Sequence, residues 1–372
     1  MKKSLLALAA MGAFAGAAQA QSSVTVSGLL EAGYTSKSAR SLGSAAGAET
    51  TASAISGGHI ATPVIRFEGT EDLGGGMSAG FAIRDEFNVG TGARASTAGV
   101  FTESFVSLAN KGFGTLSAGT MYPATRDLGG VYRFMGDIGR IASPLNSVVQ
   151  ANSIQFVSIP VQGFSASATY ASVGKTVTAN VDTNVDPVSQ LAIGLRGTIG
   201  KGSIAAAVET LKYAAASAGA DQATNTIISV GGNYDFGVAK LGAAYFDQKL
   251  ALAGGSDGGK RVAYTVHLAA PVTKVVTLGA SYGNYKITPA AGGAEPKATV
   301  MTLGVQYALS KRTSIYGSYQ QVANSDANDA MRATTLTGIN NSTTLGSSRG
   351  LAVTEINGGT GRGFGFTAVH TF

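Results

Sequence analysis

Apolar and polar residues alternate with a period of two along most of the chain. Between positions 300 and 310 the apolar side chains fall on odd positions and Ser, Thr, Gly, Gln or Ala fall between them. Positions 164–172 and 191–198 repeat this pattern. Such alternation is typical of β-strands with one apolar and one polar face, and a helical period of 3.6 is almost absent. The pattern therefore predicts an all-β protein.

Sixteen segments carry this alternation, and each is predicted to be a strand. They lie near residues 23–35, 62–70, 77–87, 100–110, 114–122, 153–158, 164–172, 188–199, 203–213, 227–235, 239–249, 260–269, 275–286, 299–310, 312–321 and 363–372.

The connections between these strands alternate in length. Seven are short and rich in Gly, Pro, Asn or Asp, as hairpin turns are, with residues 73–76 and 111–113 as examples. Eight are long, near residues 36–61, 88–99, 123–152, 173–187, 214–226, 250–259, 287–298 and 322–362. An even number of strands joined by short turns at one end and long loops at the other is the layout of a bacterial outer-membrane β-barrel. We therefore predict a 16-stranded antiparallel transmembrane β-barrel.

A soluble sandwich and a repeat propeller are the alternatives for such a strand-rich chain. A sandwich gives no reason for turn lengths to alternate so regularly. A propeller needs a repeat of ~40–50 residues, which the sequence does not show.

Residues 1–20 have the features of a signal peptide. Lys2 and Lys3 precede a short apolar stretch, and Ala18-Gln19-Ala20 forms a cleavage site, so the mature barrel is expected to span residues 21–372. The whole chain has a formal net charge of +6; without Lys2 and Lys3 the mature part has 25 basic and 21 acidic residues, a net charge of +4. Charge this sparse, without basic clusters, predicts no nucleic-acid partner.

The composition narrows the chemistry further. Charged residues make up 13% of the chain, against ~25% in soluble domains, and there is no Cys or Trp. Interfacial aromatic belts would therefore be made of Tyr and Phe. The belt candidates toward the outer strand ends are Tyr34, Tyr122, Tyr170, Tyr213, Tyr245, Phe246, Tyr264, Tyr282 and Tyr285, and those near turns or strand starts are Phe113, Phe164, Phe236 and Phe364.

Three stretches resemble one known family. They are SVTVSGLLEAG at 23–33, FEGTEDLGGG at 67–76 and FGTLSAG at 113–119, and they are joined by a terminal Phe372 that follows an apolar residue at every second position. In strand order these features resemble the trimeric general porins of Gram-negative β-proteobacteria, of the Neisseria, Bordetella and Comamonas type. The resemblance implies a homotrimer in outer-membrane lipids, whose C-terminal Phe372 is read by the barrel-assembly machinery.

The sequence departs from that family at positions that bear on the pore. The family usually has Arg at the position of Val64, a small residue at Arg66, Lys at Glu68 and Arg at Thr120. Because several basic groups of the family are missing or moved, its anion preference does not follow from the resemblance alone.

Strand parity assigns charged residues to the polar, lumen-facing side, because a charge facing lipid at the bilayer midplane costs ~2–4 kcal/mol. The candidates on strands are Glu31, Arg66, Glu68, Arg84, Glu86, Glu103, Arg196, Glu209, Asp247 and Arg261. For Asp247, Lys212 and Lys286, a solvated position at the barrel mouth is the favoured alternative.

The connection 123–152 is the candidate constriction loop, because the resemblance implies a third loop that folds into the lumen. Its Pro123 starts a bend, and Tyr132, Phe134 and Met135 could pack on the wall. An outer loop covered by solvent is the alternative. Its charges give a net of +1 and complete the pore candidates: Arg126, Asp127, Arg133, Asp137 and Arg140.

Catalytic chemistry finds little support in the chain. The three histidines, His59, His267 and His370, show no metal-ligand spacing and no sequence-adjacent acid partner. We predict no enzyme, no metal and no cofactor. We expect a passive outer-membrane channel for ions and small hydrophilic solutes with a weak anion preference. A substrate-specific channel on the same barrel is the alternative, and an adhesin or enzyme barrel is less favoured.

Overall fold

The computed structural model of the 372-residue chain describes residues 23–40, 49–58, 60–93, 101–123, 126, 131–132, 135, 150–172, 188–213, 223–290, 292, 295, 297–324 and 360–372. The N-terminal 22 residues, which contain the expected signal peptide, lie outside these ranges. Within the described ranges, no helix is both long enough and apolar enough to cross a membrane.

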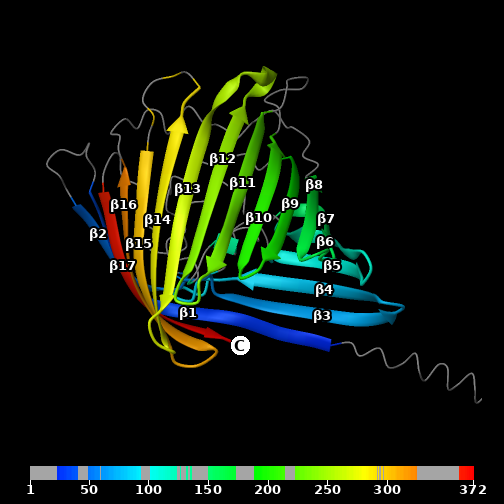
Figure 1. The fold of residues 1–372 in the computed structure, drawn as a ribbon, viewed down its shortest axis with the longest axis horizontal. Coiled ribbons are helices and arrows are strands. Elements are labelled where there is room, and N and C mark those ends of the chain that lie inside the picture. Colours follow the sequence, from blue (N-terminus) through cyan, green and yellow to red (C-terminus); the bar gives the residue numbers. More distant parts are fainter. Residues whose placement is uncertain are drawn as a thin grey trace, which may run out of the picture.

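Seventeen β-segments make up nearly all of the described chain (Figure 1). They are β1 (Ser23–Arg40), β2 (Glu49–Ser56), β3 (Val64–Gly74), β4 (Met77–Glu86), β5 (Glu103–Asn110), β6 (Gly114–Met121), β7 (Gln150–Ser158), β8 (Phe164–Ser172), β9 (Ser189–Ile199), β10 (Gly202–Lys212), β11 (Thr224–Asp235), β12 (Lys240–Ala251), β13 (Asp257–Pro271), β14 (Val276–Thr288), β15 (Lys297–Ala308), β16 (Thr313–Asn324) and β17 (Thr360–Thr371), with a 3₁₀ turn at Ala253–Gly255.

The segments form a single closed antiparallel barrel. From β3 onward each strand pairs with the next in sequence, and β17 returns to pair with β1 from Leu29↔Thr371 to Arg40↔Thr360. Among the described residues, every strand from β3 to β17 thus pairs with a neighbour on both sides, and a closed ring of this kind is the condition for spanning lipid with strands. The predicted fold class is confirmed.

Seventeen segments make sixteen barrel strands because β2 and β3 share one edge of β1. The upper half of β1 pairs with β2 and the lower half with β3. The predicted connection 36–61 was therefore partly wrong, since β1 runs on to Arg40 and β2 occupies its second half. The small, polar sequence ETTASAIS of β2 offers no large apolar alternation from which a strand could be predicted.

Glu31 fills the break between β2 and β3. Its buried carboxylate accepts hydrogen bonds from the backbone N–H of Ile60, at 2.9 and 3.0 Å, and of Ala61, at 2.7 Å, and one from the hydroxyl of Thr367 at 3.2 Å. Backbone donors that leave a β-ladder must find other acceptors when they are buried. A side chain on the inner face of β1 supplies them here.

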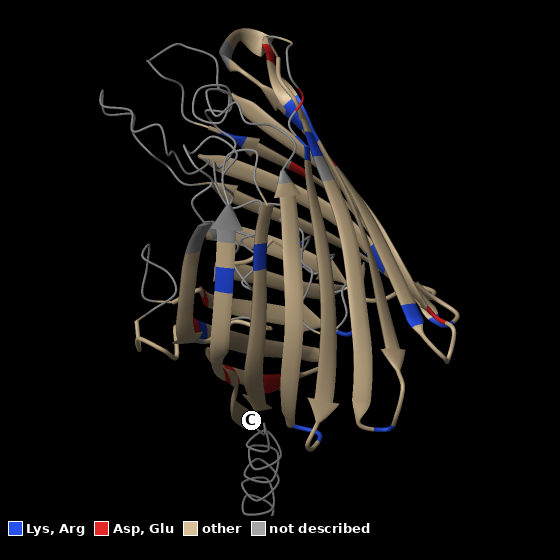
Figure 2. Cartoon of the chain, turned by 90° about the vertical axis from the view of Figure 1, so that its left-hand side faces the viewer, with Lys and Arg blue, Asp and Glu red and all other residues tan. Residues whose placement is uncertain are grey.

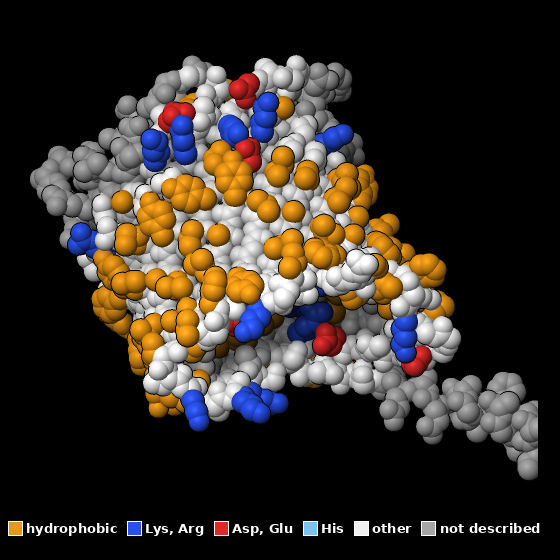
Figure 3. All heavy atoms as spheres, viewed as in Figure 1, with side chains coloured by type: hydrophobic (Ala, Val, Ile, Leu, Met, Phe, Trp, Pro, Cys, Tyr) orange, Lys and Arg blue, Asp and Glu red, His pale blue; other side chains and the backbone are white. Residues whose placement is uncertain are grey.

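Alternate residues of each strand face inward and outward. On β9, Gln190 and Ala192 are buried inside, whereas Leu191, Ile193 and Leu195 are 44–54% exposed on the outer surface. Side chains of this outward type form a broad hydrophobic band around the visible face (Figure 3). Because the barrel presents this band to its surroundings, its natural solvent there is hydrocarbon rather than water.

The wall differs in height around the barrel. Strands β9–β17 stand tall, whereas β3, β4 and β5 run low and strongly inclined (Figure 1). Strands β5 and β6 have only eight residues each, and we call β3–β6 the low wall. In the side view, Lys and Arg gather at the short turns and toward the opposite strand ends (Figure 2).

The aromatic prediction was right for some residues and wrong for others. Tyr34, Tyr170, Tyr245, Tyr264 and Tyr282 are exposed on the outer surface, as expected for a belt. Tyr122, Tyr213 and Phe246 are buried instead, the last two in a cluster on the inner wall. Tyr213 and Phe246 follow inward parity on their strands, so parity and not proximity to a strand end decides their side.

Candidate functional site

A row of charged side chains crosses the low wall on its inner face. Arg66 of β3 stands directly opposite Arg84 of β4, and Arg84 stands opposite Glu103 of β5. Glu68 and Glu86 lie two positions away on the same face of β3 and β4. Period-two parity therefore brings five of the predicted pore residues together.

Ion pairs connect the whole row. Arg66 contacts Glu68 at 2.9 Å and Glu103 at 3.0 Å, and Arg84 contacts Glu86 at 2.9 Å and Glu103 at 3.5 Å. The two guanidinium groups would repel one another as direct cross-strand neighbours, and the shared Glu103 carboxylate screens that repulsion. The ion pairs of Arg66 are partly exposed and each worth under ~1 kcal/mol, whereas the Glu86 carboxylate that pairs with Arg84 is buried. The main effect of the row is to fix where the charges stand.

Tyr122, at the end of β6, extends the row toward the long connection. Its hydroxyl donates to Glu86 at 3.3 Å, and the guanidinium of Arg126 lies 3.2 Å from its ring centroid. Arg84 lies on the same ring at 5.7 Å. A guanidinium over an aromatic face is held by the quadrupole of the ring. Tyr122 thus fixes Arg126 beside the β3–β5 charges.

Sequence reasoning missed Tyr122, which lies just past an irregular part of the ladder. The register of β6 against β7 shifts between Gly119 and Met121, and Gly119 has a φ of 145°. Gly119 pairs with Ser153 and Met121 with Gln150, so the extra residue lies on β7 and β6 keeps its own alternation up to Met121. Tyr122, one residue past β6, is buried although strict alternation from Ser117 would turn it outward.

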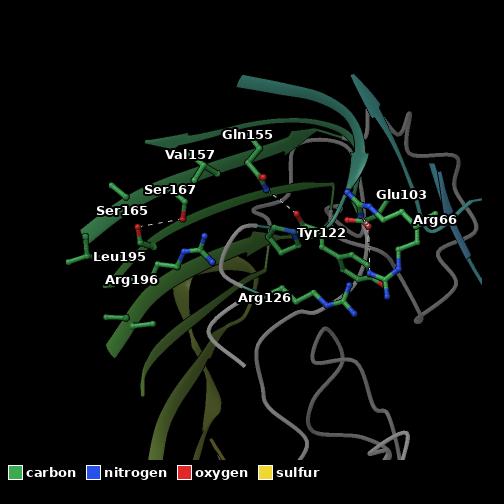
Figure 4. Close-up of a pocket in the computed structure, with 16 residues that line it drawn as sticks. Arg66, Glu103, Tyr122, Arg126, Gln155, Val157, Ser165, Ser167, Leu195 and Arg196 are labelled. Carbon is green, nitrogen blue, oxygen red and sulfur yellow. Dashed lines mark hydrogen bonds and ion pairs between the residues drawn. The ribbon is translucent and has the colours of Figure 1, made fainter. Parts of the chain in front are cut away.

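A hollow inside the barrel separates the charged row from strands β7–β9. Its β7–β9 side is polar and weakly charged. It is lined by Gln155 of β7, Ser165 and Ser167 of β8, and Arg196 of β9. The amide of Gln155 donates to the backbone carbonyl of Tyr122 and to the hydroxyl of Thr169, each at 3.0 Å. Arg196 extends toward the hollow from the wall across from Arg66, Glu103 and Arg126 (Figure 4).

The remaining predicted residues fall elsewhere or outside the description. Arg261 is inward on β13, apart from the row, and donates to Gln248 at 3.3 Å. Asp247 was a lumen candidate for which a solvated position at the barrel mouth was favoured. It lies on the outer face of β12 beside Lys260, because inward parity on β12 falls on even positions such as Phe246 and Gln248. Asp127, Arg133, Asp137 and Arg140 lie outside the described residues.

The described residues of the connection between β6 and β7 contact the inner wall far from β6. Tyr132 is buried against Phe246, with ring centroids 5.9 Å apart, and near His267, at 5.5 Å. The backbone carbonyl of Val131 accepts a hydrogen bond from Asn233 of β11. Met135 packs against a second cluster that includes Ile60 and Tyr316. These three residues of the connection therefore lie inside the barrel.

Groups suited to covalent or metal chemistry are not gathered at this site. His267 contacts the hydroxyl of Thr265 at 2.8 Å and the ring of Tyr132. In the part of the chain that the structure describes, no group of three or more His, Asp or Glu side chains could hold a metal ion. Fixed charges on a hollow wall can select solutes by size and potential.

Comparison with protein families decides the class. A family model described as Gram-negative porin matches residues 7–327. The chain belongs to the Gram-negative porin family. An outer membrane porin protein of Bordetella pertussis is 30% identical over 269 residues, which cover 66% of this chain and 69% of that protein. Outer membrane porin protein 32 of Delftia acidovorans is 32% identical over 342 residues, covering 88% and 91%.

Solved structures agree with this membership. The structure titled anion-selective porin from Comamonas acidovorans matches this porin with a TM-score of 0.71 at 26% identity, covering 95% of this chain and 100% of that one. The trimer form of OmpT from Vibrio cholerae shares the fold, with a TM-score of 0.63 at 15% identity over 94% and 99% of the two chains.

Family and fold together place the protein in the Gram-negative outer membrane as a porin channel. Members of this family and fold are channels rather than enzymes. The resemblance stated from the residues alone is confirmed by the family match, which includes all three stretches that carried it.

Proposed function

We propose that this porin is a passive diffusion pore with a weak anion preference, set by the charged row beside Tyr122 and by the connection between β6 and β7. No energy source or cofactor is required, because solutes move down their own gradients. A sixteen-stranded barrel is wide enough to hold an aqueous channel.

The single observation that carries the proposal is the charge balance around the hollow. The charged residues that line the hollow are Arg66, Arg84, Glu103, Arg126 and Arg196. Glu68 and Glu86 stand beside it, ion-paired to Arg66 and Arg84. The four Arg and three Glu side chains leave a net charge of +1. A small excess of fixed positive charge in a narrow polar neck raises the local anion concentration only modestly.

The constriction in this proposal is the connection at residues 123–152. Tyr132 and Met135 support it, because both contact inward-facing residues of distant strands. The charges of the connection sum to +1 in the sequence. Charge at the narrowest section acts on passing ions at the shortest distance, so this segment would contribute most to selectivity.

The similarity to the anion-selective porin from Comamonas acidovorans supports the same sign. The positions of the basic groups differ from the family pattern, with Arg at 66 and Glu at 68. Because three carboxylates are paired to the arginines here, we expect the preference to be weaker than an arginine-only wall would give.

Replacing Arg126, Arg133 and Arg140 together with Gln tests the proposal. In planar bilayers under a salt gradient, the zero-current potential should shift toward cations, and the shift should shrink in concentrated salt because the Debye length falls below the ~10 Å found at 0.1 M. The matched control replaces the turn residues Lys201, Lys274 and Lys311 with Gln, which removes the same charge far from the hollow. An unchanged potential and conductance in the Arg variant would refute the constriction and its role in selectivity.

We also infer a homotrimer whose contact face is the low wall. Strands β5 and β6 have eight residues, fewer than the ~9–11 that a tilted strand needs to cross the hydrocarbon core. Their outer face still exposes Val106, Leu108 and Leu116. A neighbouring copy would cover that face where the wall alone is too short, and the trimer form of OmpT shows that this fold can trimerise.

A further inference from the structure

Four lysines stand on the outer surface at the long-connection ends of β12–β15. Lys249 of β12 is directly opposite Lys260 of β13, and Lys286 of β14 is directly opposite Lys297 of β15. Lys260 and Lys286 are diagonal neighbours across β13 and β14, since Lys260 pairs with Thr288. We call these four residues the lysine rim.

Like charges directly opposite one another destabilise a sheet, because their Cβ atoms are only ~4.5–5.5 Å apart. Two acidic partners offset part of this repulsion: Asp247 contacts Lys260 at 2.7 Å, and Glu295 contacts Lys286 at 2.6 Å. A third acid, Asp257, is the first residue of β13, and its carboxylate accepts a hydrogen bond from the backbone N–H of Gly259. The four lysines therefore exceed the three nearby acids, and the two Lys–Lys pairs remain directly apposed.

A row of exposed tyrosines fixes the level of the lysine rim relative to a membrane. Tyr245, Tyr264 and Tyr282 each lie four residues closer to the barrel middle than the rim lysine on the same strand. Tyr245 pairs directly with Tyr264, and the rings of Tyr264 and Tyr282 are 6.4 Å apart. Four residues of strand span ~13 Å before tilt is allowed for.

Tyrosines in such a belt sit at the boundary between hydrocarbon and headgroups. The lysines of the rim lie four residues beyond this belt, so their charged side chains reach the headgroup layer. Figure 3 shows basic side chains gathered above the hydrophobic band at the strand ends opposite the short turns. In an outer-membrane barrel, the end with long loops faces the cell exterior, so this headgroup layer is that of the outer leaflet.

We propose that the lysine rim binds the phosphate-bearing headgroup of an outer-leaflet lipid. A phosphate between apposed lysines would accept charge-assisted hydrogen bonds from both sides and remove the repulsion within each pair. Basic residues beside a membrane surface each add to the attraction for anionic headgroups, and the effect falls away within a Debye length. The tyrosine row beneath would hold the acyl boundary of the same lipid.

The test uses the full mature porin folded in detergent and titrated with diphosphorylated lipid A, followed by native mass spectrometry. The second ligand is the same glycolipid with its phosphates removed. The test variant carries K249Q, K260Q, K286Q and K297Q. The matched control carries K111Q, K201Q, K274Q and K311Q, which removes the same charge at the short turns. We expect the wild-type and control proteins to bind the phosphorylated form about tenfold more tightly than the dephosphorylated form, and the rim variant to lose this difference.

A quadruple Lys→Arg rim variant, which keeps the charge, should bind as the wild type does and guards against a folding defect in the Gln variant. Equal binding by the Gln rim variant and the wild type would overturn the proposal, as would an equal loss in the turn control. If inorganic phosphate displaces the lipid and binds with the same affinity, the lipid assignment is overturned, because the site then recognises phosphate alone. Single-channel conductance, measured on the same variants, separates this outcome from any failure of the pore proposal.

Discussion

Glu31 illustrates how one side chain can stand in for a stretch of β-ladder. Its carboxylate is fully buried and accepts from two backbone donors where the chain leaves the edge of β1 between β2 and β3. Hydrogen bonds to a charged acceptor are each worth ~1.5–3 kcal/mol, and a buried donor left without a partner costs ~1–3 kcal/mol.

Replacing Glu31 with Ala should therefore destabilise the folded barrel by ~2–5 kcal/mol, and Glu31→Gln should have a smaller effect because its amide oxygen can still accept. The measurement is the urea midpoint of detergent-folded protein, with exposed Glu71→Gln as control. If Glu31→Ala and the control unfold at the same midpoint, the carboxylate is not needed at the break.

Parity in the sequence sufficed to place Arg66, Arg84 and Glu103 on one inner face, because β3, β4 and β5 keep a regular register. It failed for Tyr122 because this residue follows the end of β6 and is buried although strict alternation would turn it outward. It failed for Asp247 because a polar residue was taken to mark the inner face, whereas Lys260 stabilises it on the outer one. Local irregularities and salt bridges at the rim leave no periodic trace in a single sequence.

At the scale of strands, closure depends on the pairing of β1 with β17 and on the residue that follows β17. Phe372 exchanges backbone hydrogen bonds with Gly28 at 3.0 and 3.1 Å. A Cβ added to Gly28 would lie 2.5 Å from the Cζ atom of the Phe372 ring. A larger residue at position 28 would therefore clash with this ring. The two ends of the barrel sequence meet here, at the periplasmic side.

Replacing Phe372 with Ser should reduce the amount of porin inserted in the outer membrane. The change removes the ring over Gly28 and, with it, the terminal aromatic that we propose the barrel-assembly machinery reads. Quantitative blotting of outer-membrane fractions measures the inserted amount, with Phe372→Tyr as the control that keeps the ring. Wild-type surface levels of the Ser variant would show that the terminus has no such role.

Element positions were largely predictable, because sixteen amphipathic strands and alternating turn lengths leave one architecture. The turn at residues 73–76 was recognised from its glycines, and Gly74, Gly75 and Gly76 indeed have φ values of 80°, 60° and 81°. β2 was missed because its pairing with β1 owes little to large apolar side chains. The packing of Tyr132 on the inner wall was expected, whereas its partner Phe246 was not, because no local pattern encodes a contact between residues so far apart in the sequence.

At the scale of the whole molecule, the barrel is asymmetric, with a tall wall at β9–β17 and a low wall at β3–β6 (Figure 1). The tall wall carries the hydrophobic band, the tyrosine row and the lysine rim. The low wall carries the charged row on its inside. In the proposed trimer, this division would let one side meet lipid while the other forms both the selective surface of the pore and the contact with a neighbouring copy.

The proposed trimer should be visible on gels. Unheated protein should migrate as a trimer, because closed barrels resist detergent until heated. Boiled protein should unfold and run as a monomer at its chain mass. Introducing Asp at the exposed Leu108 of the low wall should shift the unheated band to the monomer, whereas Asp at Thr226 on β11 should not. A monomeric wild type, or a trimer that survives Leu108→Asp, would contradict the low-wall contact.

We infer that the barrel is an open, water-filled pore for passive diffusion, and single-channel recording of the wild-type protein in planar bilayers is the decisive measurement. We expect stepwise insertion events whose conductance rises nearly in proportion to salt concentration. The zero-current potential should indicate a slight anion preference in dilute salt and approach zero in concentrated salt. Conductance that saturates at low salt, or recordings without steps, would contradict it.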